Sequence, residues 1–240
     1  MIRVEGLCKA FGETPVLDRV TLAVSTGESC VIIGGSGTGK SVLLKCILGL
    51  VQPDAGTVLL DGEAVTRRGR EAFLSRFGML FQGAALFDSL PIWENVAFRL
   101  LRGPLRRPRA EAHEIAVEKL RRVGLSPDIA DLYPAELSGG MQKRAGLARA
   151  IAADPEILFF DEPTTGLDPI MAGIVSEMGV TALTITHDMG SVRAIADRVA
   201  LLHGGTVRWH GSVAEMDATA DPYVTQFIQG RADGPISALR

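Results

Sequence analysis

The chain has 240 residues, of which 47% are hydrophobic, and a formal net charge of −3 at pH 7. This length suffices for one large or two small domains with a substantial core, and the small negative charge argues against a nucleic-acid-binding protein. The apolar runs are far too short to cross a bilayer, and residues 1–5 lack the apolar core of a signal peptide. We therefore expect a cytoplasmic protein.

Alternating apolar residues predict half-buried strands near the start of the chain. Residues 2–4 and 20–24 alternate in this way, and Gly12 and Gly27 mark turns. Residues 58–60 predict another strand, which leads into a turn.

The three cysteines are Cys8, Cys30 and Cys46. Their number is odd and their spacing is not that of a metal site, so we expect free, reduced thiols. Cys30 and Cys46 stand in apolar runs, which predicts that both are buried.

A glycine-rich segment follows the apolar run 30–33 and precedes a segment of helical character, 42–48. It fits the pattern G-x-x-x-x-G-K-[ST] of a phosphate-binding loop, with the residues Gly34, Gly35, Ser36, Gly37, Thr38, Gly39, Lys40 and Ser41. The glycines allow successive backbone N–H groups to point at phosphate oxygens, and the helix adds its positive N-terminal end. We expect Lys40 to reach the β- and γ-phosphates of ATP and the Ser41 hydroxyl to ligate Mg²⁺.

Residues 79–151 are expected to be mostly helical, with a clear helix over 110–123 that ends at Gly124. Within this region, residues 102–109 carry four arginines. A solvated loop explains such a segment, and contact with an anionic membrane surface is the alternative.

Further strands are predicted over 157–160, 182–186 and 199–202. Strands that alternate with helices around a phosphate loop imply an α/β fold with a mostly parallel sheet.

The apolar strand over 157–160 ends in two carboxylates, Asp161 and Glu162. A buried strand tolerates charge only at its end, and ligands bind at the carboxyl ends of parallel strands. We expect Asp161 to orient Mg²⁺ through its water shell and Glu162 to accept the proton of the attacking water. A surface turn would explain an isolated pair of this kind, but the phosphate loop upstream favours a nucleotide site.

Residues 137–142 have the sequence LSGGMQ and open a predicted helix. Ser138 and the backbone N–H groups of Gly139 and Gly140 form a second anion site there. In combination with the phosphate loop and the two carboxylates, this segment resembles the LSGGQ signature of ATP-binding cassette (ABC) ATPases, with Met141 where Gln is commoner. The resemblance covers nearly the whole chain. It implies a P-loop NTPase (RecA-like) core with an N-terminal antiparallel β subdomain and a helical subdomain inserted over about 83–150.

The resemblance implies roles for four further residues. Phe11 stands where the family has an aromatic residue that stacks on adenine, and Gln82 where it has the Q-loop glutamine that contacts Mg²⁺ and the lytic water. Asp168 matches the D-loop, and His187 matches the switch histidine that touches the γ-phosphate. A core phenylalanine and a structural histidine are the ordinary alternatives for Phe11 and His187.

In ABC ATPases the LSGGQ loop covers the ATP held by the partner subunit. The resemblance therefore implies a head-to-tail dimer of two copies, in which Ser138, Gly139 and Gly140 act on the neighbour's nucleotide. It also implies a membrane permease, which Gln82 would sense.

Four segments narrow the resemblance to the Mla-type ATPases: 78–90, 137–145, 166–170 and 230–235. These are motors of bacterial systems that move phospholipids or other hydrophobic molecules between the inner and outer membranes, together with Mce-type lipid-binding proteins. The resemblance implies a peripheral protein on the cytoplasmic face of the inner membrane, a small regulatory subunit, and no nucleic-acid partner. It assigns 1–229 to the ATPase domain and 230–240 to a C-terminal extension that packs on the partner ATPase.

The interval from Asp168 to His187 is 19 positions (187 − 168), fewer than is usual in the family. The shortfall is about eight residues, or ~12 Å of helix. A truncated helix over 170–177 explains it, and so does a sequence that lacks an internal segment. The length of this interval determines where Asp168 and His187 lie in the site. A shorter interval is therefore expected to affect hydrolysis more than ATP binding.

Three other functions compete with lipid transport. An ABC motor for a polar solute such as an amino acid shares every motif above. A soluble ABC ATPase that acts on DNA or ribosomes usually carries coiled-coil inserts or two cassettes, whereas this chain has one cassette and no heptad run. A P-loop kinase has no use for the second anion loop or for His187.

Overall fold

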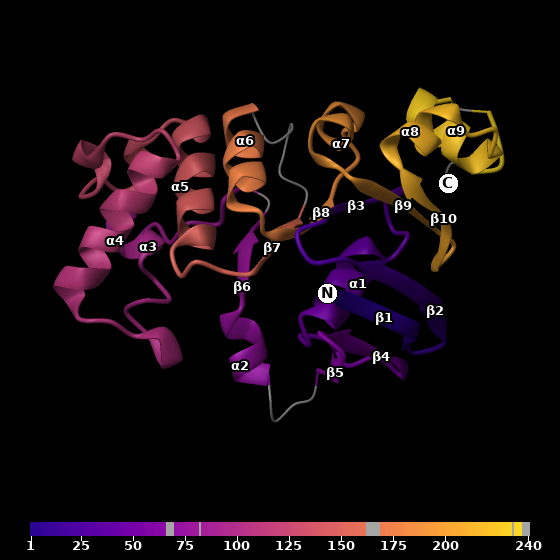
Figure 1. Cartoon of the computed structure of the whole chain (residues 1–240), viewed down its shortest axis with the longest axis horizontal. Helices are drawn as coiled ribbons and strands as arrows, with labels where there is room; N and C mark the ends of the chain where they lie inside the picture. Colours follow the sequence, from indigo (N-terminus) through magenta and orange to yellow (C-terminus); the bar gives the residue numbers. More distant parts are fainter. Residues whose placement is uncertain (66–69, 82, 162–168, 232, 237–240) are drawn as a thin grey trace. The chain divides into compact units, whose positions relative to one another are not determined.

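The computed structural model (Figure 1) describes residues 1–65, 70–81, 83–161, 169–231 and 233–236, with backbone alone at 70–71 and 169–172. The chain divides into two units: Met1–Val65 with Ile185–Arg240, and Thr66–Thr184. Both units contain helices and strands, so the predicted α/β class is confirmed.

The first unit contains an antiparallel sheet with the strand order β2-β1-β4-β5. Its strands are β1 (Ile2–Phe11), β2 (Thr14–Val24), β4 (Ala55–Leu60) and β5 (Glu63–Ala64). Ile2 pairs with Val24 on one side and with Leu60 on the other. Its own side chain and that of Val4 are buried, so the alternation in the sequence selects the inward face, and Leu7 is buried after a register shift that follows Val4. The expected N-terminal antiparallel β subdomain is confirmed.

Three further strands of this unit follow the order β10-β9-β3. β3 (Ser29–Ile33) is parallel to β9 (Arg198–His203), and β9 is antiparallel to β10 (Thr206–Ser212). The sequence patterns did not predict β10. It is reached through Gly204 and Gly205, whose φ values of 56° and 75° make the tight turn that suits a hairpin.

The core of this unit surrounds β3 and β9. It includes the fully buried side chains of Val31, Ile33, Val192, Val199, Leu201, Met216 and Val224. Met216 belongs to α8 (Val213–Ala218) and Val224 to α9 (Pro222–Gln229), both yellow in Figure 1, and Val192 belongs to α7 (Met189–Ile195). The two C-terminal helices therefore complete this core.

The C-terminal extension is described as far as Ile236, apart from residue 232. The buried Gln226 side chain accepts a hydrogen bond from the Ile236 amide at 2.7 Å and donates one to its carbonyl at 2.9 Å. This part of the extension folds back on α9 of its own chain. Its packing on a partner ATPase stays a prediction.

Cys30 and Cys46 are buried, as predicted, and Cys8 is half-buried; all three are free thiols. Burial raises the pKa of the Cys30 thiol to about 12 and that of the Cys46 thiol to about 11. Both are therefore protonated and inert at neutral pH.

In the second unit, the strand order β8-β7-β6 joins β8 (Thr181–Ile185), β7 (Ile157–Asp161) and β6 (Phe77–Leu80). β6 corrects the expectation that Met79 and Leu80 are helical. A four-residue apolar run fits either a helix or a strand, and parallel pairing with β7 decides the outcome. At Gly78, a Cβ would lie 2.1 Å from the carbonyl oxygen of Ala150, so this strand position requires glycine.

Three helices of this unit pack on one another: α3 (Ile92–Val96), α4 (Arg109–Arg122) and α5 (Gly139–Ile151). α4 confirms the helix predicted over 110–123, and Gly124 (φ 73°) follows its end. Short 3₁₀ turns at Gly103–Leu105, Pro127–Ile129 and Pro134–Glu136 link the helices. None of the described helices has the length and apolar character needed to span a membrane.

Two shorter helices complete the second unit, α2 (Arg70–Ser75) and α6 (Pro169–Met178). α6 has 10 residues and is followed by Gly179 (φ 60°), after which β8 begins at Thr181. The predicted short helix is confirmed, and the shortened interval still contains both a helix and a strand.

Candidate functional site

The phosphate-loop motif of residues 34–41 links β3 to α1 (Lys40–Ile47) in the first unit, and its last two residues are the first two of the helix. Two of its glycines lie too close to neighbouring strands for any side chain. At Gly39 (φ 101°), a Cβ would lie 2.9 Å from both Leu17 Cδ2 and the Val16 carbonyl oxygen. At Gly34, a Cβ would lie 2.4 Å from the carbonyl oxygen of Leu202. Close packing against β9 and β2 therefore imposes glycine at positions 34 and 39.

Lys40 places its ammonium group inside this loop. The residue is 7% exposed, and its Nζ donates hydrogen bonds of 2.8 Å to the carbonyls of Gly34 and Gly35. Thr38 Oγ1 also donates to the Gly35 carbonyl, at 2.9 Å, which closes the loop on itself. α1 has no side-chain cap and no acidic residue in its first turn, so its positive end is not neutralised locally. The loop fits a bound phosphate chain.

His187 belongs to the same unit and follows β8, and the chain there lies beside the end of β3. The amide of Thr186 donates to the carbonyl of Ile32 at 3.3 Å, one residue before the end of that strand. Asp188 caps α7 by accepting from the amides of Gly190 (3.3 Å) and Ser191 (2.9 Å). The Ser191 hydroxyl, together with these amides, holds the pKa of Asp188 below its ordinary value. The exposed His187 is therefore fixed on both sides at the sheet edge where the phosphate loop begins.

Phe11 ends β1 and is 52% exposed, so the alternative of a core phenylalanine is wrong. It pairs with Thr14 in the β1–β2 hairpin, and β2 also supplies the Val16 and Leu17 contacts to Gly39. The Lys9 ammonium lies 5.4 Å from the centre of the ring. An exposed ring on this hairpin is compatible with stacking on adenine.

Asp161 lies at the end of β7 in the second unit and is half-buried. Leu80 pairs with Phe160, so β6 and β7 end at the same edge. Gln82, two residues beyond the end of β6, and Glu162, which follows β7, lie outside the described residues, as does Asp168. Their predicted roles rest on the sequence.

Arg149 of α5 is a positioning residue that the sequence analysis missed. Its guanidinium donates to the carbonyls of Ala84 (2.6 Å) and Ala85 (2.7 Å) and lies 6.0 Å from the Phe81 ring. Both alanines have positive φ, at 63° and 47°, which is unfavourable for residues other than glycine. Burial lowers the pKa of the guanidinium. Arg149 therefore holds the backbone that follows position 82 and also contacts the ring that precedes it. In the sequence, the feature that could have indicated this role is a charged residue among the alanines of α5.

The second anion site lies at the start of α5. Ser138 Oγ accepts from the Met141 amide at 3.3 Å, and Gln142 Nε2 donates to the carbonyls of Pro134 (2.8 Å) and Leu137 (3.2 Å). Ser138, Gly139 and Gly140 are exposed, and a Cβ on either glycine would meet no atom within 4 Å. The helix start is thus open to an approaching ligand.

The predicted site residues thus fall into two groups. Phe11, the phosphate loop and His187 belong to the first unit, and Asp161 with Ser138, Gly139 and Gly140 belongs to the second. Each group has the polar groups that bind a nucleotide at the ends of strands or helices.

Comparisons with known proteins agree with this arrangement. The ABC transporter family model matches residues 17–165. The chain is 40% identical to the intermembrane phospholipid transport ATP-binding protein MlaF of Escherichia coli, over 94% of this chain and 87% of that protein. It is 39% identical to the probable ribonucleotide transport ATP-binding protein mkl of Mycobacterium leprae, over 98% of this chain and 70% of that protein.

Solved structures of ABC cassettes have the same fold. The ATP-binding cassette MJ0796, solved as a dimer, is 30% identical with a TM-score of 0.77, over 89% of this chain and 99% of that one. A post-hydrolysis form of it, bound to ADP and phosphate, matches equally well. The protein cbiO1 of Clostridium perfringens is 27% identical with a TM-score of 0.80, over 95% of this chain and 94% of that one. The chain therefore belongs to the ABC transporter family, as an ATP-binding ATPase.

Proposed function

We propose that the chain is the motor of a bacterial ABC transporter that moves phospholipids or other hydrophobic molecules between membranes. The observation that carries this proposal is the 40% identity to MlaF over 94% of the chain. The identity extends over nearly the whole length and so includes residues outside the nucleotide motifs.

The phosphate loop explains how ATP is held. Lys40 exchanges its bonds to the carbonyls of Gly34 and Gly35 for the oxygens of the β- and γ-phosphates, which stabilises their charge in a site of low exposure. His187, fixed at the same sheet edge, contacts the γ-phosphate, and Phe11 stacks on the adenine ring. Ser36, Gly37 and the other loop residues contribute backbone amides.

Hydrolysis needs a base and a metal. Glu162 accepts a proton from the attacking water, and Asp168 contributes from the D-loop. The hydroxyl of Ser41, the amide oxygen of Gln82 and the carboxylate of Asp161 are hard oxygen ligands of the kind that Mg²⁺ prefers. When bound, Mg²⁺ neutralises charge on the β- and γ-phosphates.

The active form is a head-to-tail dimer with a second copy of the chain. The open start of α5, with Ser138, Gly139 and Gly140, then binds the γ-phosphate of the partner's ATP. The dimeric MJ0796 cassette supports this proposal. The dimer works on the cytoplasmic face of the inner membrane, together with a permease, an Mce-type lipid-binding protein and a small regulatory subunit. Domain limits of 1–229 and 230–240, with a helical subdomain over about 83–150, belong to the same proposal.

Two measurements test the proposal. Glu162→Gln should retain ATP and abolish turnover, because the variant lacks a base; undiminished hydrolysis would exclude Glu162 from that role. Purification with the native membrane partners should recover a lipid-binding protein. Recovery of a binding protein for a polar solute, such as the ribonucleotide after which mkl is named, would contradict the lipid assignment.

A further inference from the structure

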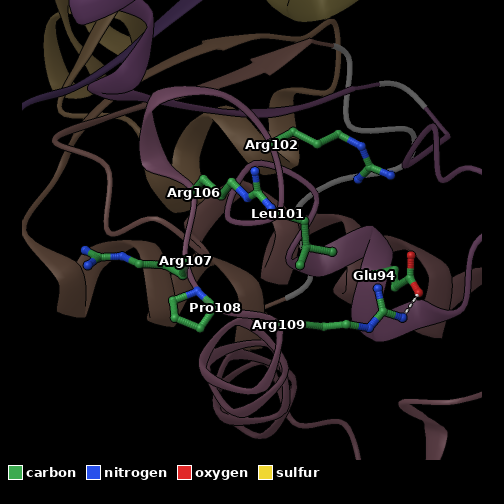
Figure 2. Close-up of a pocket in the computed structure, with 7 residues that line it drawn as sticks. All are labelled: Glu94, Leu101, Arg102, Arg106, Arg107, Pro108 and Arg109. Carbon is green, nitrogen blue, oxygen red and sulfur yellow. Dashed lines mark hydrogen bonds and ion pairs between the residues drawn. The ribbon is translucent and has the colours of Figure 1, made fainter.

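A basic pocket lies beside the start of α4 in the second unit (Figure 2). It has a volume of about 520 Å³ and is lined by Glu94, Leu101, Arg102, Arg106, Arg107, Pro108 and Arg109. The four arginines come from one segment of eight residues, 102–109. None of the lining residues belongs to the phosphate loop, to β7 or to the start of α5.

The pocket carries more positive than negative charge. Arg109 pairs with Glu94 at 2.6 Å, the dashed contact in Figure 2, and Arg107 lies 3.8 Å from Glu111. Within the part of the chain that the structure describes, no carboxylate lies within ion-pair distance of Arg102 or Arg106. These two guanidinium groups leave a local excess of two positive charges on a chain whose net charge is −3.

Aromatic rings and backbone bonds hold the segment in place. Arg102 lies over the Phe98 ring at 4.3 Å and Arg109 over the Trp93 ring at 4.6 Å. The Arg107 amide donates to the Leu100 carbonyl at 2.7 Å, and the Arg106 amide bonds the Gly103 carbonyl at 3.2 Å. The ring contacts lower the entropy that the guanidinium groups of Arg102 and Arg109 lose when they close on a ligand, and the backbone bonds fix the loop that carries all four arginines.

We propose that this pocket binds a phosphate-bearing anion, either the phosphate of an anionic phospholipid headgroup or a soluble phosphate ester. The planar guanidinium group matches phosphate oxygens in pairs, which an isolated ammonium does not. The volume is within the range of small-molecule sites and accommodates a headgroup together with its glycerol. This site is additional to the ATP site, and its test does not depend on which molecule is transported.

The test uses the full chain with its phosphate loop saturated with ADP. One probe is a vesicle of phosphatidylcholine with or without phosphatidylglycerol, followed by co-sedimentation; the other is glycerol 3-phosphate, followed by calorimetry. The double variant Arg102→Gln, Arg106→Gln removes the two arginines that lack a carboxylate. The matched control, Arg121→Gln with Arg122→Gln, removes the same charge from exposed positions at the far end of α4.

The pocket variant should weaken anion binding at least about tenfold, and the control less than about threefold, with ATP hydrolysis unchanged in both. Glu94→Gln should strengthen binding several-fold, because it releases Arg109 from its carboxylate. Binding to phosphatidylglycerol vesicles alone identifies a headgroup site, and binding of glycerol 3-phosphate with the same arginine dependence identifies a soluble ester. The proposal is wrong if the wild-type chain binds neither probe, or if the two double variants weaken binding equally.

Discussion

Replacement of Lys40 by methionine removes the cation at the centre of the phosphate loop while keeping an unbranched side chain of similar length. In the structure Lys40 is 7% exposed, and its ammonium group donates hydrogen bonds of 2.8 Å to the carbonyls of Gly34 and Gly35. Its donors are therefore already directed to the place where phosphate oxygens bind.

The size of the effect follows from those two bonds. A hydrogen bond to a charged group contributes about 1.5–3 kcal/mol. Lys40 gives up bonds to two carbonyls when it turns to the phosphates, so the net loss in the variant is smaller than two full bonds, about 2–4 kcal/mol. This corresponds to ATP affinity lower by roughly 30- to 1000-fold.

The assay is calorimetric titration of the full chain with ATP. Lys45→Met is the matched control, because Lys45 is an exposed lysine of the same helix and its loss changes the net charge equally. We expect the control to bind ATP within about twofold of the wild type. If Lys40→Met also bound ATP within threefold of the wild type, the inference that Lys40 holds the phosphates would be refuted.

Three further predictions concern the second anion site, the thiols and the short interval before His187. Ser138→Arg should abolish hydrolysis in the dimer but leave ATP binding by the isolated chain within about twofold, because in the proposed dimer the residue acts on the partner's nucleotide; loss of binding by the isolated chain would contradict a role in trans. With raised pKa values of about 12 and 11, Cys30 and Cys46 carry a smaller thiolate fraction than an ordinary thiol at pH 8, so iodoacetamide should label Cys8 first. Labelling located by mass spectrometry should reach the two buried thiols only on unfolding, and equal labelling of all three in the folded chain would contradict their burial. Insertion of eight helical residues after Gly173 should leave hydrolysis no higher than in the wild type if the ten-residue α6 is sufficient, and rescue of an inactive chain by the insertion would show that it is not.

Contiguous motifs were predictable because their physics is local. The phosphate loop needs only a strand, a glycine-rich turn and a helix start in direct succession, and the structure has β3, residues 34–39 and α1 in that order. The helix over 110–123 was predictable for a similar reason, since its apolar positions recur with the helical period and a glycine follows it. The short helix before β8 was expected because the interval from Asp168 to His187 is shorter than is usual in the family.

Tertiary structure decided what depends on residues distant in sequence. β6 is a strand because it pairs with β7, about eighty residues later, and no local pattern in four apolar residues distinguishes it from a helix. Arg149 bonds the carbonyls of Ala84 and Ala85, which lie 65 and 64 positions before it.

The segment 102–109 shows both contributions. The sequence determined that four arginines occur close together, and it left open a solvated loop and, as the alternative, contact with an anionic membrane surface. The structure decided which of them are paired with carboxylates, which lie on aromatic rings, and that a pocket lies between them. The physical reason is that charge composition is a property of the chain, whereas the pairing of each charge depends on the distances that folding sets.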